Sequence, residues 1–233
     1  MLTSIYLYLH QGLGDTIACN GIIRTYAEKY NKVFVFCKPR NTKNVMYMFR
    51  DNPRIYAMPI EEDQIIQFMN ICPNNEYLIV GHKELHEKLR NDPNARFDQI
   101  FYEMAKVPFE DKWNKFYFER NLEEEKDVYY NKLGLKDNIE FIFVHDDAER
   151  PMLQSKLPKG IKIIKPDRKD ISVFDFLYTI ERSQQVHCID SSFLNLIDCM
   201  QLRNDNLYFH KYVKIGLVGE GGTPTTKLNW IIL

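Results

Sequence analysis

Short apolar runs alternate with amphipathic stretches along residues 1–106 of the chain. The apolar runs predict strands at residues 4–9, 33–37, 54–58 and 77–80. The stretches that follow them have apolar residues at helical spacing and predict helices at residues 15–30, 42–50, 61–70 and 82–106, the last broken near Pro93. Strands and helices in strict alternation are typical of a parallel sheet with right-handed crossovers.

The alternation stops at residues 107–127, which are rich in charged and aromatic side chains and have no clean period. It then restarts, with strands predicted at residues 140–144, 161–164, 185–189, 207–209 and 227–233, helices at 122–133, 172–183 and after Asp190, and a loop at 216–226. The sequence therefore predicts an α/β protein with two Rossmann-like parallel-sheet domains facing a cleft. These are residues 1–110 and 135–233, joined by a linker and helix at residues 111–134.

Composition argues against several classes of protein. Lys and Arg number 31 against 32 Asp and Glu, a net charge of −1, whereas dedicated nucleic-acid or membrane-surface proteins usually carry a basic excess. The five cysteines include no CxxC pair, so a reducing compartment is expected. With no apolar run of about 18 residues and no basic segment before the first apolar run, we expect a cytoplasmic protein without a membrane span.

Polar residues that follow a parallel strand are the first candidates for chemistry, because ligands bind beyond the carboxyl ends of such strands. The first group, His10 to Thr16, lies between a strand and a helix. Gly12 and Gly14 allow a tight turn and close backbone approach. Asp15 is either the N-cap of the helix or a general base, and the two roles are compatible. The group lacks the spacing of a dinucleotide-binding fingerprint.

The second group follows the strand predicted at residues 185–189. Asp190, Ser191 and Ser192 precede a helix whose N-terminus offers free N–H groups and a partial positive charge, which suits a diphosphate. An ordinary Asp/Ser helix cap is the alternative interpretation.

Two further groups also follow strands of the second half. His145, Arg150 and Lys156 could bind phosphate oxygens, Arg150 through a bidentate fork, although a solvated charged turn and a buried His145 are equally compatible with the pattern. His210 and Lys211 are additional candidates, for which surface exposure is the alternative.

Metal and nucleotide-hydrolysis motifs are missing from the sequence. His82 and His86 have helical i, i+4 spacing but lack the glutamate of HExxH, so we interpret them as an exposed helix face. The chain has no GxxxxGK[ST] phosphate loop and no GxSxG elbow. We expect neither a metal ion nor another cofactor.

Gly14-Asp15 and Asp190-Ser191 occupy strand-to-helix junctions in separate halves, and this arrangement resembles the GT-B glycosyltransferases. The chain most resembles the ADP-heptose:lipopolysaccharide heptosyltransferase group and its distant relatives. That group opens with strand, Gly-Asp and helix, and its second domain has strand, Asp-Ser-Gly and helix. Residues 170–192 follow the same order of helix, strand and motif, and the loop from His145 to Arg150 is similar to the donor-binding His and Arg of GT-B fucosyltransferases.

The resemblance implies a metal-independent, inverting transfer of a sugar from a nucleotide-sugar donor to an acceptor hydroxyl on a glycan or another molecule. It implies Asp15 as the base, and it implies donor binding by Gly12, Gly14, His145, Arg150, Lys156, Asp190, Ser191 and Ser192. The alternative is a non-catalytic relative that binds a nucleotide or a glycan. A nucleotide-sugar epimerase is a weaker alternative, because it would need the missing dinucleotide fingerprint.

Overall fold

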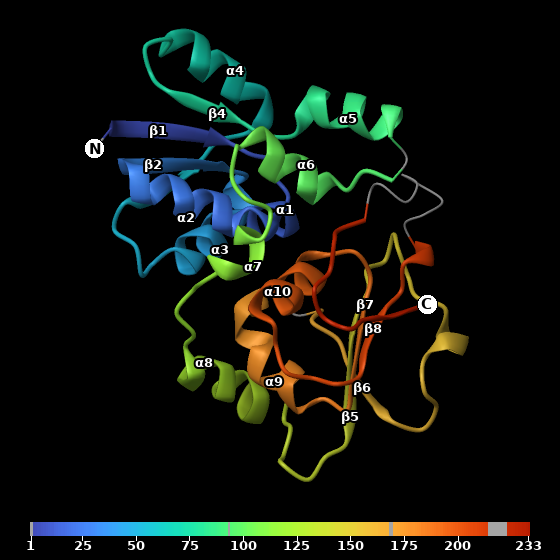
Figure 1. Cartoon of the computed structure of the whole chain (residues 1–233). Helices are drawn as coiled ribbons and strands as arrows, with labels where there is room; N and C mark the ends of the chain where they lie inside the picture. Colours follow the sequence, from blue (N-terminus) through green and yellow to red (C-terminus); the bar gives the residue numbers. More distant parts are fainter. Residues whose placement is uncertain (1, 93, 168–169, 214–222) are drawn as a thin grey trace. The chain divides into compact units, whose positions relative to one another are not determined.

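The chain forms two compact units, Met1–Glu119 and Arg120–Leu233. The computed structural model describes residues 2–92, 94–167, 170–213 and 223–233. Each unit has its own sheet, and every strand pairing in both sheets is parallel. The prediction of two parallel α/β halves is therefore confirmed (Figure 1).

The sheet of unit 1 has the strand order β3-β2-β1-β4 in the described residues. Its strands are β1 (Leu2–Tyr8), β2 (Tyr30–Cys37), β3 (Ile55–Pro59) and β4 (Tyr77–Ile79). The strand order reverses between β1 and β4, and such a reversal creates a crevice beyond the carboxyl ends of the two strands. This topological switch point is where the fold of unit 1 favours a ligand.

Helices cover both faces of this sheet. The described helices are α1 (Leu13–Ala18), α2 (Asn20–Lys29), α3 (Thr42–Met48), α4 (Glu62–Ile71), α5 (His82–Asn91), α6 (Phe97–Met104) and α7 (Asp111–Asn114). Figure 1 shows α4 on the face opposite α2 and α3, as expected when the chain crosses back to reach β4. Pro93, where a helix break is predicted, lies outside the described residues.

The single helix predicted at residues 15–30 is wrong, because α1 and α2 are separated at Cys19. Cys19 has a φ of −87° and a ψ of 5°, although its backbone N–H still donates to the backbone oxygen of Asp15 at 2.9 Å. A Cβ atom on Gly21 would lie 2.1 Å from the backbone oxygen of Asp111, so α2 approaches the start of α7 closely. The contact is possible because glycine has no side chain. Helical periodicity cannot predict such a contact.

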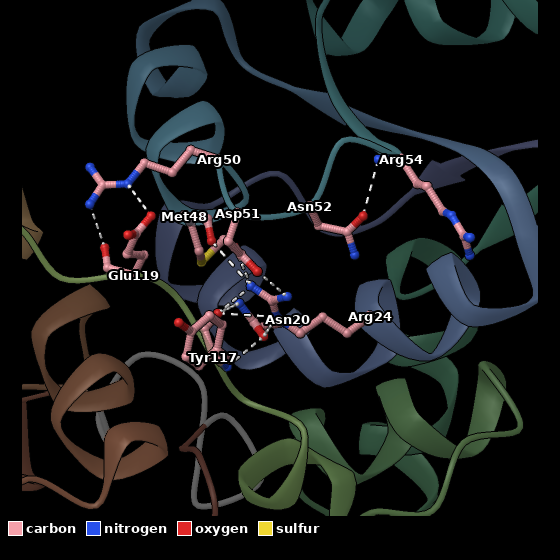
Figure 2. Close-up of polar contacts among 9 residues, drawn as sticks. All are labelled: Asn20, Arg24, Met48, Arg50, Asp51, Asn52, Arg54, Tyr117 and Glu119. Atoms are coloured by element: carbon pink, nitrogen blue, oxygen red, sulfur yellow. Dashed lines mark hydrogen bonds and ion pairs between the residues drawn. The ribbon is translucent and has the colours of Figure 1, made fainter.

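The segment at residues 117–119 is fixed to unit 1 by polar contacts (Figure 2). The backbone oxygen of Tyr117 accepts hydrogen bonds from Arg24 Nη2 at 2.6 Å and from Asn20 Nδ2 at 3.1 Å. Arg50 Nη2 donates to the backbone oxygen of Glu119 at 2.8 Å. Arg24 also donates to both carboxylate oxygens of Asp51, each at 2.9 Å.

The sheet of unit 2 has the strand order β6-β5-β7-β8-β9 in the described residues. Its strands are β5 (Phe141–His145), β6 (Lys162–Ile164), β7 (Gln185–Cys188), β8 (Leu207–Phe209) and β9 (Ile231–Ile232). In chain order this is the doubly wound arrangement 2-1-3-4-5, which has its switch point between β5 and β7. The core is built from these strands, with Phe141, Ile142, Phe143 and Val144 of β5 all fully buried.

The described helices of unit 2 include α8 (Leu122–Asp127), α9 (Leu177–Arg182) and α10 (Ser192–Met200). The helix predicted at residues 122–133 is present but continues after α8 as a π-helix at Val128–Lys132. Gly134, with a φ of +60°, follows it as predicted. Residues 214–222, which include most of the predicted loop at 216–226, lie outside the described residues.

No helix in the described part of the chain has the length and hydropathy needed to cross a membrane.

Candidate functional site

The switch point of unit 1 brings together two histidines and a carboxylate. His10 follows β1, and His82 follows β4 at the first position of α5. The Nδ1 atom of His10 lies 3.2 Å from Oδ2 of Asp15. The His10 and His82 rings have centroids 5.7 Å apart. The close approach depends on Gly81, which has a φ of +94° and whose Cβ would lie 3.4 Å from His10 Cδ2.

Asp15 lies in the first turn of α1, and the N-cap residue is Gly12. The N-cap interpretation of Asp15 is therefore wrong: the carboxylate pairs with His10 instead. A Cβ on Gly12 would lie 2.3 Å from Asp15 Oδ2, so the missing side chain at Gly12 leaves room for this oxygen. The first turn of a helix also favours a negative charge. Gly14 precedes Asp15 in the same turn.

The surroundings set the protonation of the two imidazoles. The hydrogen bond to Asp15 raises the pKa of His10 and outweighs burial, which acts in the opposite direction; Glu62 also raises it and Lys38 lowers it. Burial and the neighbouring His10 lower the pKa of His82. His10 therefore holds its proton more tightly than an ordinary histidine, and His82 less tightly.

Sequence reasoning placed His10 and Gln11 in the first candidate group without giving them a role, and it missed His82 as a member of this site. The exposed helix face predicted for His82 and His86 is wrong for His82, which is half-buried against the ring of Tyr8 at a centroid distance of 3.9 Å. Gln11 is 3% exposed, and within the described residues neither atom of its side-chain amide has a hydrogen-bond partner. Knowledge of the strand order 3-2-1-4 would have identified them, because this order places the residues after β1 and those after β4 side by side.

A cavity of about 480 Å³ lies beyond the carboxyl ends of β2 and β3. It is lined by Lys38, Pro39, Arg40, Glu61, Glu62 and Asp63. Lys38 Nζ and Glu62 Oε2 are 3.6 Å apart, and both residues influence the pKa of His10. The cavity therefore adjoins the histidine site on the same edge of the sheet.

The switch point of unit 2 brings together several predicted residues. Arg150 Nη1 donates to the backbone oxygen of Asp190 at 3.0 Å, which joins the loop after β5 to the end of β7. Ser191 Oγ accepts a hydrogen bond from Leu194 N at 3.4 Å and is the N-cap of α10, so the ordinary cap interpretation is confirmed for Ser191. Ser192 begins α10 and is half-buried.

The loop that carries Arg150 is an ordered turn and not a freely solvated one. Asp147 Oδ2 accepts from Nη2 and Nε of Arg150 at 2.6 and 3.0 Å, while Asp147 Oδ1 accepts from the backbone N–H of Arg150 at 2.8 Å. Partial burial raises the pKa of Asp147, but the Arg150 guanidinium outweighs it and the net effect is a lowered pKa. Asp146 is fixed in the same way by Lys165 Nζ at 2.5 Å. The guanidinium is thus held at the end of β7 before any ligand binds.

His145 ends β5 and packs against the ring of Phe193, with centroids 4.6 Å apart. Burial lowers its pKa to about 4, so the imidazole is neutral at neutral pH. Its Nδ1 is buried and has no hydrogen-bond partner in the part of the chain that the structure describes. This nitrogen could therefore hydrogen-bond to a ligand.

Three remaining predicted residues lie further along the loop and β8. Lys156 is exposed at the end of a 3-10 turn. The surface interpretation is wrong for His210, which is completely buried, and Lys211 is half-buried. His210 Nε2 lies 2.9 Å from His187 Nδ1, and His210 Nδ1 lies 3.0 Å from the Tyr212 hydroxyl. His210 therefore belongs to a buried hydrogen-bond chain.

Searching the described residues for clusters of three or more His, Cys, Asp or Glu side chains that could hold a metal ion finds none.

The fold is shared with solved glycosyltransferases. A glycosyl transferase of family 9 from Veillonella parvula DSM 2008 superposes on 100% of this chain and 86% of its own, with a TM-score of 0.58 and 9% sequence identity. The ADP-heptose LPS heptosyltransferase II of E. coli covers 100% of this chain and 90% of its own, with a TM-score of 0.53 and 8% identity. No family model and no curated protein matches the sequence.

The resemblance to GT-B glycosyltransferases drawn from Gly14-Asp15 and Asp190-Ser191 is thus confirmed at the level of the fold. At 8–9% identity the similarity extends to the fold alone.

Proposed function

We propose that the protein is a glycosyltransferase that moves a sugar from a nucleotide-sugar donor to an acceptor hydroxyl with inversion. The observation that carries the proposal is the His10–Asp15 pair at the switch point of the unit 1 sheet. It occurs in a chain whose whole length has the fold of solved glycosyltransferases. A carboxylate paired with an imidazole is a suitable base for removing a proton from a hydroxyl.

In this proposal the switch point of unit 2 binds the donor diphosphate. Arg150 and Lys156 supply positive charge, and the N-terminus of α10 at Ser191 and Ser192 supplies N–H groups. Asp190 orients Arg150 through its backbone oxygen. Charge that develops on the departing diphosphate is stabilised by these groups, which makes the transfer independent of a metal ion.

In unit 1 the reaction needs a group that receives the proton of the acceptor hydroxyl. The hydrogen-bonded pair of Asp15 and His10 provides this base. Gly12 and Gly14 allow the backbone at this edge to approach the substrate. The adjoining cavity, which has side chains of both charges, provides room for a polar acceptor.

Thermal unfolding with UDP-, GDP-, ADP- and dTDP-sugars tests donor binding, because a specific ligand raises apparent stability by RT ln(1 + [L]/Kd). We expect one nucleotide class to raise the Tm and Arg150→Ala to abolish that rise. Arg203→Ala, which removes an exposed arginine of the same unit, is the matched control and should retain it.

Release of nucleoside diphosphate in the presence of mixed mono- and oligosaccharide acceptors then tests transfer. Turnover supports a glycosyltransferase. Binding without turnover of any donor would support a non-catalytic nucleotide-binding protein, and an Arg150→Ala variant with wild-type affinity would remove Arg150 from the site.

A further inference from the structure

We infer that the acceptor proton is taken by Nε2 of His10, and that Asp15 is a positioning residue that acts through this imidazole. This inference rests on the proposed function, because it names the atom of the pair that meets the substrate. It differs from direct deprotonation by the carboxylate, which the sequence predicts.

The contact between the two residues determines which nitrogen is available. Nδ1 of His10 faces Oδ2 of Asp15 at 3.2 Å. A carboxylate can only accept, so Nδ1 carries the hydrogen and donates it. In the neutral ring, Nε2 is then the unprotonated nitrogen. The pair therefore keeps a free lone pair on the side of the ring that points away from Asp15.

Exposure also distinguishes the two groups. The side chain of His10 is 40% exposed and that of Asp15 is 24% exposed. Asp15 Oδ2 lies against Gly12, at the place that a Cβ would fill, and the other face of this oxygen is occupied by His10. The imidazole is therefore the more accessible member of the pair.

The His10 ring is held by neighbours that come from the opposite side of the switch point. It stacks on Phe101 of α6 at a centroid distance of 6.2 Å and an interplanar angle of 28°. His82 of α5 lies 5.7 Å away, and Gly81 packs against the Cβ and Cδ2 atoms of His10. Residues of α6 and of the start of α5 thus pack around the His10 ring.

The charged groups around His10 make it a stronger base. They are Asp15 on α1, Lys38 after β2, Glu62 on α4 and the weakly basic His82 on α5. The two carboxylates favour the imidazolium more than Lys38 and burial disfavour it, so the pKa of His10 is raised. A base with a pKa near the working pH is efficient.

The acceptor O–H bond breaks and its proton moves to His10 Nε2. The oxygen electron pair forms the bond to the anomeric carbon, and the bond from that carbon to the diphosphate oxygen breaks. The diphosphate leaves with the electron pair, and the imidazolium is stabilised by Asp15 until it loses its proton to water.

A substrate-free experiment tests the pair. Nitrogen-15 NMR of the histidine rings should show His10 protonated at Nδ1 in its neutral form, with a pKa above 6.5. In Asp15→Asn the pKa should fall and the preference for that tautomer should weaken. An unchanged His10 titration in Asp15→Asn would overturn the inference, because Asp15 would then not control the ring.

The pH profile of kcat/KM for nucleoside diphosphate release, with the donor found in the thermal panel, tests catalysis. We expect the wild-type rate to rise with pH through the pKa of His10, and His10→Gln to lose about 10²- to 10⁴-fold and to lose that rise. Asp15→Asn should retain a residual rate with the rise moved to lower pH. His86→Gln, an exposed position on α5, is the matched control and should behave as wild type.

Different results would overturn the role of His10 and the proposed glycosyltransferase activity. A His10→Gln variant with wild-type turnover, or a wild-type profile that is flat above pH 5.5, overturns the role of His10 and leaves the glycosyltransferase intact. Wild-type protein that releases nucleoside diphosphate from none of the donors overturns the proposed function, and the role of His10 with it.

Discussion

Nδ1 of His187 lies 2.9 Å from Nε2 of His210, and both imidazoles are at most 1% exposed. The pair joins β7 to the end of β8, and the chain continues through Tyr212 to the backbone N–H of Leu153. Burial lowers the pKa of both histidines to about 4, with a further lowering of His187 by His210. One ring must donate and the other must accept, so the accepting ring is neutral, and the lowered pKa values make both rings neutral at pH 7.

The pair makes unit 2 sensitive to acid. Both histidines regain a pKa of about 6.5 in the unfolded chain, so unfolding takes up protons between pH 6.5 and 4. The contribution of the two histidines to the free energy of unfolding is constant above pH 6.5. It falls as the pH drops from 6.5 to 4, by up to about 1.4 kcal/mol per pH unit for each histidine. Urea unfolding at pH 7, 6 and 5 measures this fall, and His210→Gln should make it shallower. Ring titration by NMR that placed both pKa values near 6.5 would contradict the prediction.

A second prediction concerns the ion pair between Lys112 and Asp98. Their charged atoms are 2.5 Å apart, and neither side chain is exposed. Lys112→Met would remove the ammonium group that pairs with the buried Asp98 carboxylate, which costs about 3–5 kcal/mol, whereas Lys112→Met with Asp98→Leu should recover most of that loss. Urea unfolding of unit 1 measures both.

Lys88 and Glu103 provide the matched control for that experiment. They are 2.7 Å apart, but the side chains are 33% and 68% exposed. Lys88→Met should cost less than about 1 kcal/mol. Equal losses from Lys88→Met and Lys112→Met would show that burial does not determine the strength of these pairs.

Gly12 and Gly21 should differ when each is replaced by alanine. At Gly12 the new Cβ would meet the Asp15 carboxylate, which can rotate away from His10, so we expect little change in Tm and a lower pKa of His10. At Gly21 it would meet the backbone of Asp111, which cannot move without shifting α7. Gly21→Ala should therefore lower the Tm of unit 1 clearly. Thermal unfolding and histidine NMR on the two variants measure the contrast, and a similar Tm for both would contradict it.

Asp198 connects α10 to the last strand of unit 2. Its Oδ1 accepts from Leu228 N at 3.0 Å and from the indole Nε1 of Trp230 at 3.1 Å. Asp198→Ala leaves these donors without their acceptor, so we expect Trp230 to become exposed and its fluorescence to shift to longer wavelength. Asp205→Ala, at an exposed position, should leave the spectrum unchanged, and an unchanged spectrum in Asp198→Ala would refute this role.

Most of the fold was predictable because the strands are continuous apolar runs, such as Val33 to Cys37, which β2 contains. The break at Cys19 was not, because apolar spacing does not report the backbone angles of a single residue. The close approach of Gly21 to Asp111, some 90 positions away, was not predictable either. Periodicity along one helix cannot detect a neighbour from another part of the chain.

The sequence predicted at which strand ends the candidate residues lie, but it did not predict which side chains they contact. Arg150 and Asp190 do meet, because they follow adjacent parallel strands. The helix cap assigned to Asp15 and the exposed face assigned to His82 were wrong for one reason: each depends on where a helix begins. The N-cap residues of these two helices are Gly12 and Gly81.

The hydrogen bonds from residues 227–230 to Asp198 also affect the order in which the molecule can be made. Three of the four strands of the first sheet precede Pro73, and β4 completes the sheet once Ile79 has left the ribosome. The second sheet must wait for Trp230 and β9. During synthesis, unit 2 therefore spends longer as an incomplete nascent chain, and this is the stage at which chaperone contact should matter most.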